Sequence, residues 1–286
     1  MLDRTRNMTL RFPALPTVLL AVAILAASVS SAAAITWGTQ RWCPKYSGEI
    51  LQSTGRVAAD LQEDIAEYRR RLGGIDNGNN PGQTSGHRSI NWDAAVVPFN
   101  MPGDFFRNNV TRGAEFLAVE GRFAVSNPPP ADAPSDVRDN RFSSFNSKFA
   151  WLFRTFSPKR LFTPVKSNQV RILFSVPQSN RAAHVSGFAA VFTNVVLRGE
   201  TLMHFYDANE CLILRLPIIP QRRGLSFSGI IVKGRNGQRI DVATIASVKI
   251  TLGNAIISEP INHKARRKNV VVLDDLIYGE PQPIDH

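Results

Sequence analysis

Motifs typical of catalytic and metal sites are scarce in this sequence. The five histidines include no H-x-H or H-E-x-x-H pair, so the sequence does not indicate a zinc site. There is no G-x-S-x-G nucleophile motif, no phosphate-cradling glycine loop and no signature of a catalytic cysteine. The first hypotheses about this chain are therefore not drawn from the enzyme classes that such motifs identify.

Acidic residues are also in the minority. The chain has 34 lysines and arginines against 23 aspartates and glutamates, and its formal net charge is +11. A basic chain favours anionic partners such as acidic polysaccharide, anionic lipid or nucleic acid. The basic cluster at residues 263–268 and the pair Arg222–Arg223 are candidate contacts for an anionic polymer. No nucleic-acid-binding motif accompanies them, and a solvated surface without a specific partner is the simpler alternative.

Long hydrophobic runs are absent except for one short segment near the N-terminus. Three arginines within the first eleven residues precede the apolar run at 18–27, and small residues follow at 31–34. This order is typical of a signal peptide over residues 1–34, and an uncleaved anchor is the alternative. No second run approaches the length of a membrane span. The sequence thus predicts a secreted mature chain that begins near residue 35 and contains no membrane span.

Cysteine is nearly absent, and the two present are Cys43 and Cys211. An oxidising extracellular compartment permits a disulfide between them. Such a bridge would join the N-terminal segment to a late strand. The alternative is two unpaired thiols, because sequence alone does not show whether two cysteines lie close together.

Residues 35–85 are expected to form an arm, one helix and a turn-rich linker. The helix is predicted at residues 57–72, where apolar side chains recur at helical spacing. The positions of this stripe are Val57, Leu61, Ile65, Tyr68 and Leu72. Gly73 and Gly74 follow and end the helix. A single apolar stripe is typical of a helix that packs on its own domain.

Residues 86–280 are expected to form an all-β domain, with residues 281–286 as a C-terminal tail. Runs of β-branched and aromatic residues are separated by turn residues every eight to twelve positions, which is typical of a sandwich or barrel. A hairpin is predicted at 115–126. Further strands are predicted at 149–156, 160–163, 170–176, 184–197, 201–206, 211–219, 225–233, 240–252 and 269–278.

The stretch at residues 86–116 mixes aromatic and acidic side chains more densely than any other. It predicts an entry strand, a loop at the rim of a sheet and a second strand. Near the C-terminus, Asp274 and Asp275 interrupt the apolar run of the last strand. Adjacent strand residues point to opposite faces, so only a bulge would turn both acids to one site. Buried acids of this kind need a metal ion, amide donors or an arginine such as Arg88 or Arg112.

Five late segments resemble a family pattern. They are VSGFAAVFT at 185–193, LMHFYDANE at 202–210, GLSFSGIIV at 224–232, IASVKITL at 245–252 and VVVLDDLIY at 270–278. Together with INWD and FNMPGDFF in the early stretch, they resemble secreted jelly-roll β-sandwich proteins of the galactose-binding-like type. The resemblance implies a calcium ion where the first and last strands meet, with Asp93, Asp104, Asp274 and Asp275 as candidate ligands. Glu210 stands where the pattern usually has glycine.

Three residues are candidates for contact with a ligand. Trp92 and Tyr206 are candidates for stacking against a sugar ring, and Arg112 is a candidate cationic contact. Core positions are the alternative for aromatic residues in apolar strands. Asn109 begins an N-glycosylation motif, N-V-T, which applies only in a eukaryotic source.

Two kinds of function are consistent with these patterns. The first is a secreted, non-catalytic module that binds carbohydrate or another extracellular polymer and contains a structural calcium ion. The second is a polysaccharide-acting enzyme that uses a pair of carboxyl groups such as Asp93 and Asp104. A purely structural envelope or matrix protein is a third alternative. Carboxylates in an open cleft favour the enzyme, whereas carboxylates that converge on a buried point favour the module.

Overall fold

The computed structural model describes residues 41–42, 46–127, 142–234, 244–259 and 268–284. These residues belong to one compact unit, Ile35–His286. The predicted signal peptide lies outside the described residues, as does nearly all of the basic cluster at 263–268. Within the described ranges, no helix is both long and apolar enough to cross a membrane.

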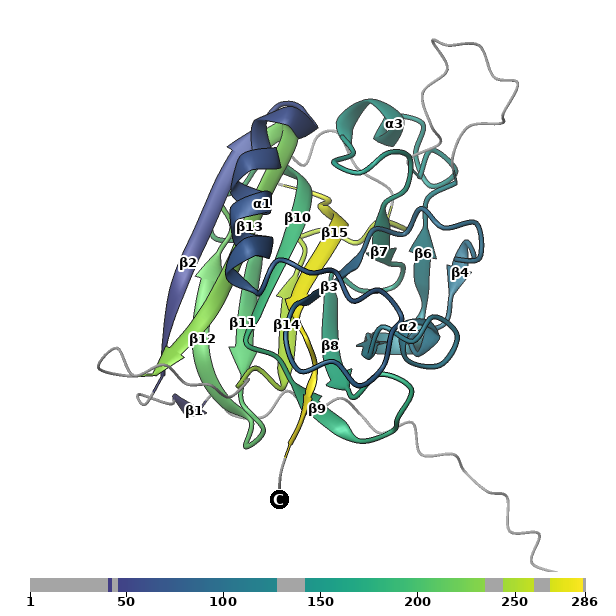
Figure 1. The fold of residues 1–286 in the computed structure, drawn as a ribbon. Coiled ribbons are helices and arrows are strands. Elements are labelled where there is room, and N and C mark those ends of the chain that lie inside the picture. Colours follow the sequence, from purple (N-terminus) through teal and green to yellow (C-terminus); the bar gives the residue numbers. More distant parts are fainter. Residues whose placement is uncertain (1–40, 43–45, 128–141, 235–243, 260–267, 285–286) are drawn as a thin grey trace, which may run out of the picture. The chain divides into compact units, whose positions relative to one another are not determined.

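Two sheets make up most of the described chain (Figure 1). Sheet A contains, in spatial order, β1 (Arg41–Trp42), β12 (Cys211–Pro217), β11 (Leu202–Tyr206), β14 (Ser247–Thr251), β8 (Gln169–Ser175), β9 (Ala182–His184) and β16 (Gln282–Pro283), and β5 (Ala114–Leu117) also pairs with β8. Sheet B contains β2 (Tyr46–Gly55), β13 (Gln221–Gly234), β10 (Gly187–Val195), β15 (Val272–Gly279), β7 (Phe162–Pro164), β6 (Phe123–Val125) and β4 (Asn100–Met101), and β3 (His87–Ile90) also pairs with β15. The pairing is antiparallel in both sheets, apart from β1, which runs parallel to β12.

The main core lies between the two sheets. Alternate residues of each strand face it, as Val170 and Ile172 of β8 and Phe188, Ala190 and Phe192 of β10 do, and all five are fully buried. Because two sheets bury their inner faces against each other, the architecture is that of a β-sandwich. The prediction of a mostly β fold is confirmed at this level.

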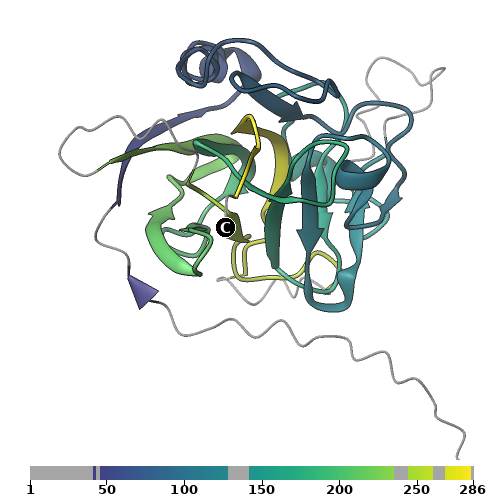
Figure 2. The ribbon, with the colours of Figure 1, turned by 60° about the horizontal axis from the view of Figure 1, so that its bottom comes forward.

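The predicted helix is also confirmed. A short 3-10 helix, η1 (Ala58–Leu61), leads into α1 (Gln62–Arg71). Four residues of the predicted apolar stripe pack on the outer face of sheet B, namely Leu61, Ile65, Tyr68 and Leu72, whereas Val57 precedes η1 and is exposed. Figure 2 shows the helix outside that layer. Tyr68 reaches the sheet and donates its hydroxyl proton to the carbonyl of Ile230 at 2.9 Å. A Cβ at Gly187 would lie 2.9 Å from that hydroxyl, so glycine leaves the space that the ring occupies.

Three local predictions are wrong. The expected strand at 149–156 contains the short helix α3 (Phe149–Leu152), whose last turn stacks Phe149 on Phe153 with ring centroids 5.0 Å apart. The expected hairpin at 115–126 does not form, because β5 belongs to sheet A and β6 to sheet B, with η2 (Val119–Gly121) between them. The expected N-terminal arm contains β2, which pairs with β13 over ten residues and forms part of the sandwich.

Candidate functional site

A β-bulge in β15 turns both acids of the last strand to the same side. Leu276 pairs with Ala190 and Leu273 pairs with Phe192, so Asp274 and Asp275 together oppose one residue of β10. Leu273 and Leu276 both face the main core although they are three positions apart. The two acids between them therefore both point to the outer side of sheet B.

Asp274 is the most deeply buried of these acids, with no exposed surface. Its carboxylate accepts the backbone N–H of Phe156 at 2.6 Å and the hydroxyl of Ser157 at 3.0 Å. Burial raises the pKa of Asp274 well above its ordinary value, and the neighbouring charge of Asp275 raises it further. Amide donors from the loop after α3 are thus one means by which the protein accommodates a buried acid here.

Asp275 shares this environment but has fewer donors. Its Oδ2 lies 3.7 Å from the guanidinium of Arg69 on α1, while its Oδ1 is buried without a hydrogen-bond partner. Burial raises the pKa of Asp275. Arg69 therefore faces Asp275, whereas the sequence pointed to Arg88 and Arg112.

Asp93 completes what we call the acid cluster: Asp93, Asp274 and Asp275. Its Oδ1 accepts the backbone N–H of Arg160 at 3.0 Å, and its Oδ2 is buried without a donor. Desolvation raises the pKa of Asp93 to about 6, and the charge of Asp275 adds to this effect. The early stretch and the last strand thus meet in one carboxyl-rich site, which includes three of the four predicted metal ligands.

Trp92 lies beside the cluster and inside the core, with 1% of its surface exposed. Its indole N–H donates to the backbone carbonyl of Asp274 at 2.6 Å, and its ring stacks on Phe162 with centroids 4.2 Å apart. The residue adopts a φ of +66°, a left-handed conformation that is uncommon for a bulky side chain. Since both ring faces are covered, Trp92 cannot stack on a sugar in this structure.

The remaining candidates of the early stretch lie apart from these contacts. Asp104 precedes α2 (Phe105–Asn108) and accepts the side-chain amide of Asn108 at 2.8 Å. Arg112 donates to the carbonyl of Ser89 at 2.6 Å and is 24% exposed. Asn109 follows α2 at an exposed position, which is compatible with its glycosylation motif.

A buried ion pair, Arg88 and Glu280, lies outside the acid cluster. The Arg88 guanidinium donates two hydrogen bonds to the Glu280 carboxylate, at 2.7 and 2.8 Å, and both side chains are at most 2% exposed. The same guanidinium donates to the carbonyls of Gly78 and Asn80, each at 2.6 Å. This network holds the linker that follows α1 against the C-terminal end of β15.

A second site lies on the outer face of sheet A, and sequence reasoning missed it. In neighbouring strands, Arg215 pairs with His204, His204 pairs with Lys249, and Lys249 pairs with Arg171. Residues that pair directly across strands present their side chains on the same face. These four residues, the basic row, therefore lie side by side although they come from four strands. In the sequence, each of the four strands has a basic residue at an outward position. Whether these residues align depends on the register between neighbouring strands.

Electrostatic coupling follows from this arrangement. Burial lowers the pKa of His204, and the positive charges of Arg215 and Lys249 lower it further, which disfavours the protonated imidazole. The pKa of Lys249 is also lowered, by burial and by Arg171. The Nδ1 atom of His204 is buried without a hydrogen-bond partner. The row thus places positive charges on both sides of a histidine whose protonated form is disfavoured.

Tyr206 lies next to the basic row on the same strand as His204 and is part-exposed. The Arg171 guanidinium lies over its ring, 5.7 Å from the centroid. Arg171 also forms an ion pair with Glu210 and donates to the hydroxyl of Ser247 at 2.8 Å. Among the predicted ligand contacts, Tyr206 is therefore the aromatic residue that lies at a part-exposed, cationic surface.

The structure does not directly test the predicted calcium ion or the predicted disulfide between Cys43 and Cys211. Within the described ranges, no group of three or more His, Cys, Asp and Glu side chains is arranged to hold a metal ion. Cys43 lies outside the described residues, so its bridge to Cys211 remains a prediction. The ladder between β1 and β12 pairs Arg41 with Cys211, which brings the backbone just before Cys43 alongside that residue.

The fold and the two sites define the class of this protein as a β-sandwich with a buried acid cluster and a cationic outer face. Comparison of the chain with protein-family models, with curated proteins and with solved structures found no match. The function is therefore argued from the geometry of the described residues.

Proposed function

We propose that this chain is a secreted, non-catalytic β-sandwich module of the jelly-roll, galactose-binding-like type that binds an anionic extracellular polymer. The observation that carries the proposal is the basic row on the outer face of sheet A, formed by Arg215, His204, Lys249 and Arg171. Tyr206 adds a part-exposed aromatic ring at its border.

The energetics of the basic row favour an anionic ligand. Like charges that lie directly opposite on neighbouring strands destabilise a sheet. Burial is the larger cause of the lowered pKa values of His204 and Lys249, and the neighbouring cations lower both pKa values further, which is the electrostatic sign of this repulsion. A carboxylate or sulfate group placed over the row would relieve it. A polymer that carries several such groups would contact several strands at once, and the positive net charge of the chain would attract it from a distance.

The acid cluster favours a binding module over a glycosidase. A glycosidase needs two carboxyl groups that flank the substrate in an accessible cleft. Asp274 is fully buried and Asp275 is 3% exposed, so neither side chain is accessible to a polysaccharide. Asp93 and Asp104, the pair named for the alternative enzyme hypothesis, share none of the hydrogen bonds described above. The carboxyl groups converge on a buried point around the hydroxyl of Ser157, as expected for a structural role.

Calcium is a second element of the proposal, and it depends on two atoms of the acid cluster. Asp93 Oδ2 and Asp275 Oδ1 are buried oxygens without donors, and hard cations bind such oxygens. A saturating cation stabilises the folded state, by about 2.7 kcal/mol at one hundred times its dissociation constant. We expect calcium to raise the melting temperature of the chain and EDTA to reverse the effect. Absence of a shift, or the same shift in Asp275→Asn, would remove calcium from the proposal.

The polymer-binding proposal is tested with variants of the basic row. Each of Lys249→Gln and Arg215→Gln removes one positive charge from the proposed site. We expect either change to weaken binding of a sulfated or carboxylated polymer by about threefold to fivefold, the effect of a partly exposed ion pair. Binding should also weaken as salt increases, because salt screens exposed charges.

Arg56→Gln is the matched control. Arg56 is an exposed residue that follows β2 in sheet B. Its replacement by glutamine removes one positive charge, as each basic-row substitution does. Isothermal titration calorimetry with the wild-type chain and the three variants gives the comparison. The proposal is overturned if no polyanion binds at low salt, or if Arg56→Gln weakens binding as much as the basic-row variants do.

A further inference from the structure

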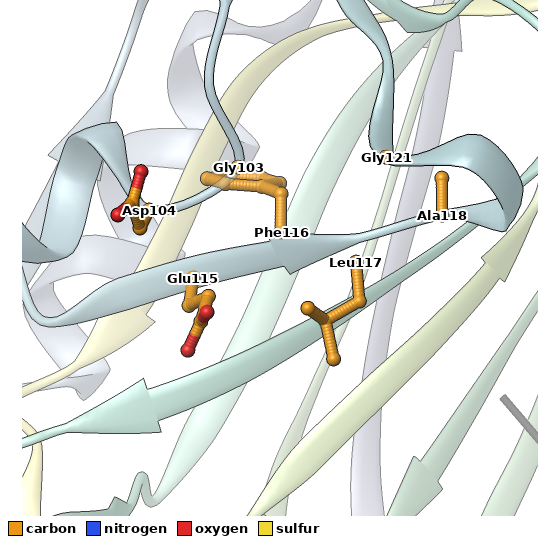
Figure 3. Close-up of a pocket in the computed structure, with 7 residues that line it drawn as sticks. All are labelled: Gly103, Asp104, Glu115, Phe116, Leu117, Ala118 and Gly121. Atoms are coloured by element: carbon orange, nitrogen blue, oxygen red, sulfur yellow. The ribbon is translucent and has the colours of Figure 1, made fainter. Parts of the chain in front are cut away.

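A pocket lies at the β5 side of the basic row. It has a volume of about 260 Å³ and is lined by Gly103, Asp104, Glu115, Phe116, Leu117, Ala118 and Gly121 (Figure 3). Leu117 pairs with Arg171 across β5 and β8, so it continues the basic row by one strand. Figure 3 shows Glu115 and Leu117 on the same side of β5, with Phe116 on the other side. The pocket and the basic row therefore border each other.

The chemistry of the pocket differs from that of the row. Asp104 and Glu115 supply carboxylate oxygens, which accept hydrogen bonds. Arg107 pairs with Glu115 at 2.5 Å, and Asn108 donates to Asp104 at 2.8 Å. Arg107 balances the charge of Glu115, and the charge of Asp104 remains. The pocket therefore repels an anion and favours groups that donate hydrogen bonds. Hydroxyl groups are uncharged donors that meet this requirement.

Two glycines, Gly103 and Gly121, shape the lining of the pocket. A Cβ at Gly121 would meet no atom within 4 Å, so this residue leaves open space at the pocket. Gly103 crosses β5 closely, and its carbonyl accepts the backbone N–H of Phe116 at 2.8 Å. A Cβ at Gly103 would lie 2.2 Å from the carbonyl oxygen of Phe116, so only glycine allows this crossing. Leu117 supplies an apolar surface for the C–H groups of a ring.

We infer that the pocket binds an uncharged, hydroxyl-bearing sugar ring of the polymer whose charged groups lie on the basic row. The inference rests on the proposed function and names its ligand class. The polymer is an acidic polysaccharide in which uncharged rings accompany charged ones. Anions without hydroxyl groups would contact the row alone, and a polymer charged on every ring would be repelled from the pocket.

Three probes separate the two sites. Hyaluronan has alternating charged and uncharged rings, polygalacturonate is charged on every ring, and polyphosphate has no sugar. We expect the wild-type chain to bind hyaluronan more tightly than polygalacturonate. Asp104→Asn and Glu115→Gln should each weaken hyaluronan binding by about tenfold, the effect of weakening one hydrogen bond to a charged acceptor. Neither change should weaken polyphosphate binding.

Glu120→Gln is the matched control, because Glu120 is an exposed acid of η2 that does not line the pocket. Melting curves of all variants check that each is folded, and Leu117→Ala gives a second pocket variant without a charge change. If the wild-type chain binds hyaluronan and the pocket variants bind it equally well, the inference is overturned and the proposed function stands. If the wild-type chain binds none of the three probes, the proposed function and the inference both fall.

Discussion

The indole of Trp92 donates its N–H to the backbone carbonyl of Asp274 at 2.6 Å, across 182 positions of sequence. A bulge interrupts the ladder hydrogen bonds of its strand, and this carbonyl belongs to the bulge in β15. Trp92 therefore satisfies a backbone group that the neighbouring strand does not. The same tryptophan positions Asp93 next to Asp275, so one contact links the early stretch, the bulge and the acid cluster.

Replacement of Trp92 by phenylalanine tests this contact. The ring remains apolar, but the carbonyl of Asp274 loses its donor inside the core. We expect Trp92→Phe to lower the free energy of unfolding by about 1–3 kcal/mol, the penalty for a buried polar group left without a partner. Urea unfolding measures the change. Trp151→Phe is the control, because Trp151 is 63% exposed and its replacement should change stability by less than about 0.5 kcal/mol.

Asp93 predicts how stability depends on pH. Its pKa is raised from 3.8 to about 6, so the folded state holds the proton more tightly than the unfolded state does. Protonated Asp93 therefore stabilises the folded state. This stabilisation is fully present at a pH below 3.8, the ordinary pKa of an aspartate, and is lost as the pH rises through about 6. The raised pKa values of Asp274 and Asp275 act in the same direction.

Urea unfolding between pH 4 and pH 7 tests this dependence in the wild-type chain and in Asp93→Asn. We expect the decrease in stability with rising pH to be smaller in the variant, because an amide does not ionise. Asp104→Asn is the control, since Asp104 lies outside the acid cluster. Equal slopes in the wild-type chain and Asp93→Asn would contradict the assignment.

The pair Arg88 and Glu280 predicts a large loss of stability. Glu280→Gln leaves the Arg88 charge buried without its carboxylate, which should lower the free energy of unfolding by about 3–5 kcal/mol. Glu115→Gln removes the acid from a part-exposed pair with Arg107 and should lower it by less than about 1 kcal/mol. Chemical denaturation of both variants measures the difference. Similar small effects would show that burial of the Arg88 pair does not determine its energy.

The predicted bridge between Cys43 and Cys211 is tested by thiol alkylation. We expect the native chain to be modified at neither cysteine before reduction and at both afterwards, as read by mass spectrometry. Cys211→Ser should then lower the free energy of unfolding by about 2–5 kcal/mol, within the range for the loss of a native disulfide. Alkylation of both cysteines without reduction would show that they are free thiols.

Local patterns were predictable where neighbouring residues carry the information. The helix at 57–72 was predicted because apolar residues recur there once per helical turn. The structure has η1 and α1 in this range. Runs of β-branched and aromatic residues between turn residues likewise predicted strands such as β8, β10 and β11. The segment at 149–156 was mistaken for a strand because its aromatic residues suit both structures, and here the spacing of Phe149 and Phe153 suits a helical turn.

The acid cluster was predictable only in part. Its three members were named from the sequence because acids in apolar or aromatic surroundings are expensive to bury. Their convergence depends on the bulge, and nothing in the residues 272–279 themselves shows where the ladder shifts. Asp104 was grouped with them because it is close in sequence, yet it lines the pocket beside β5. The covered position of Trp92 also follows from packing that brings Phe162 against it.

The sequence by itself determined the β-rich class, the single packed helix, the basic charge and the identity of most acids that matter. These properties depend on residue type and on spacing along one strand or helix turn. Only the tertiary structure decided which side chains meet. The basic row is the clearest case, since Arg171, His204, Arg215 and Lys249 become neighbours through the register of four strands. Register results from the packing of the whole core, because a shift by one residue would turn every side chain of a strand to the opposite face.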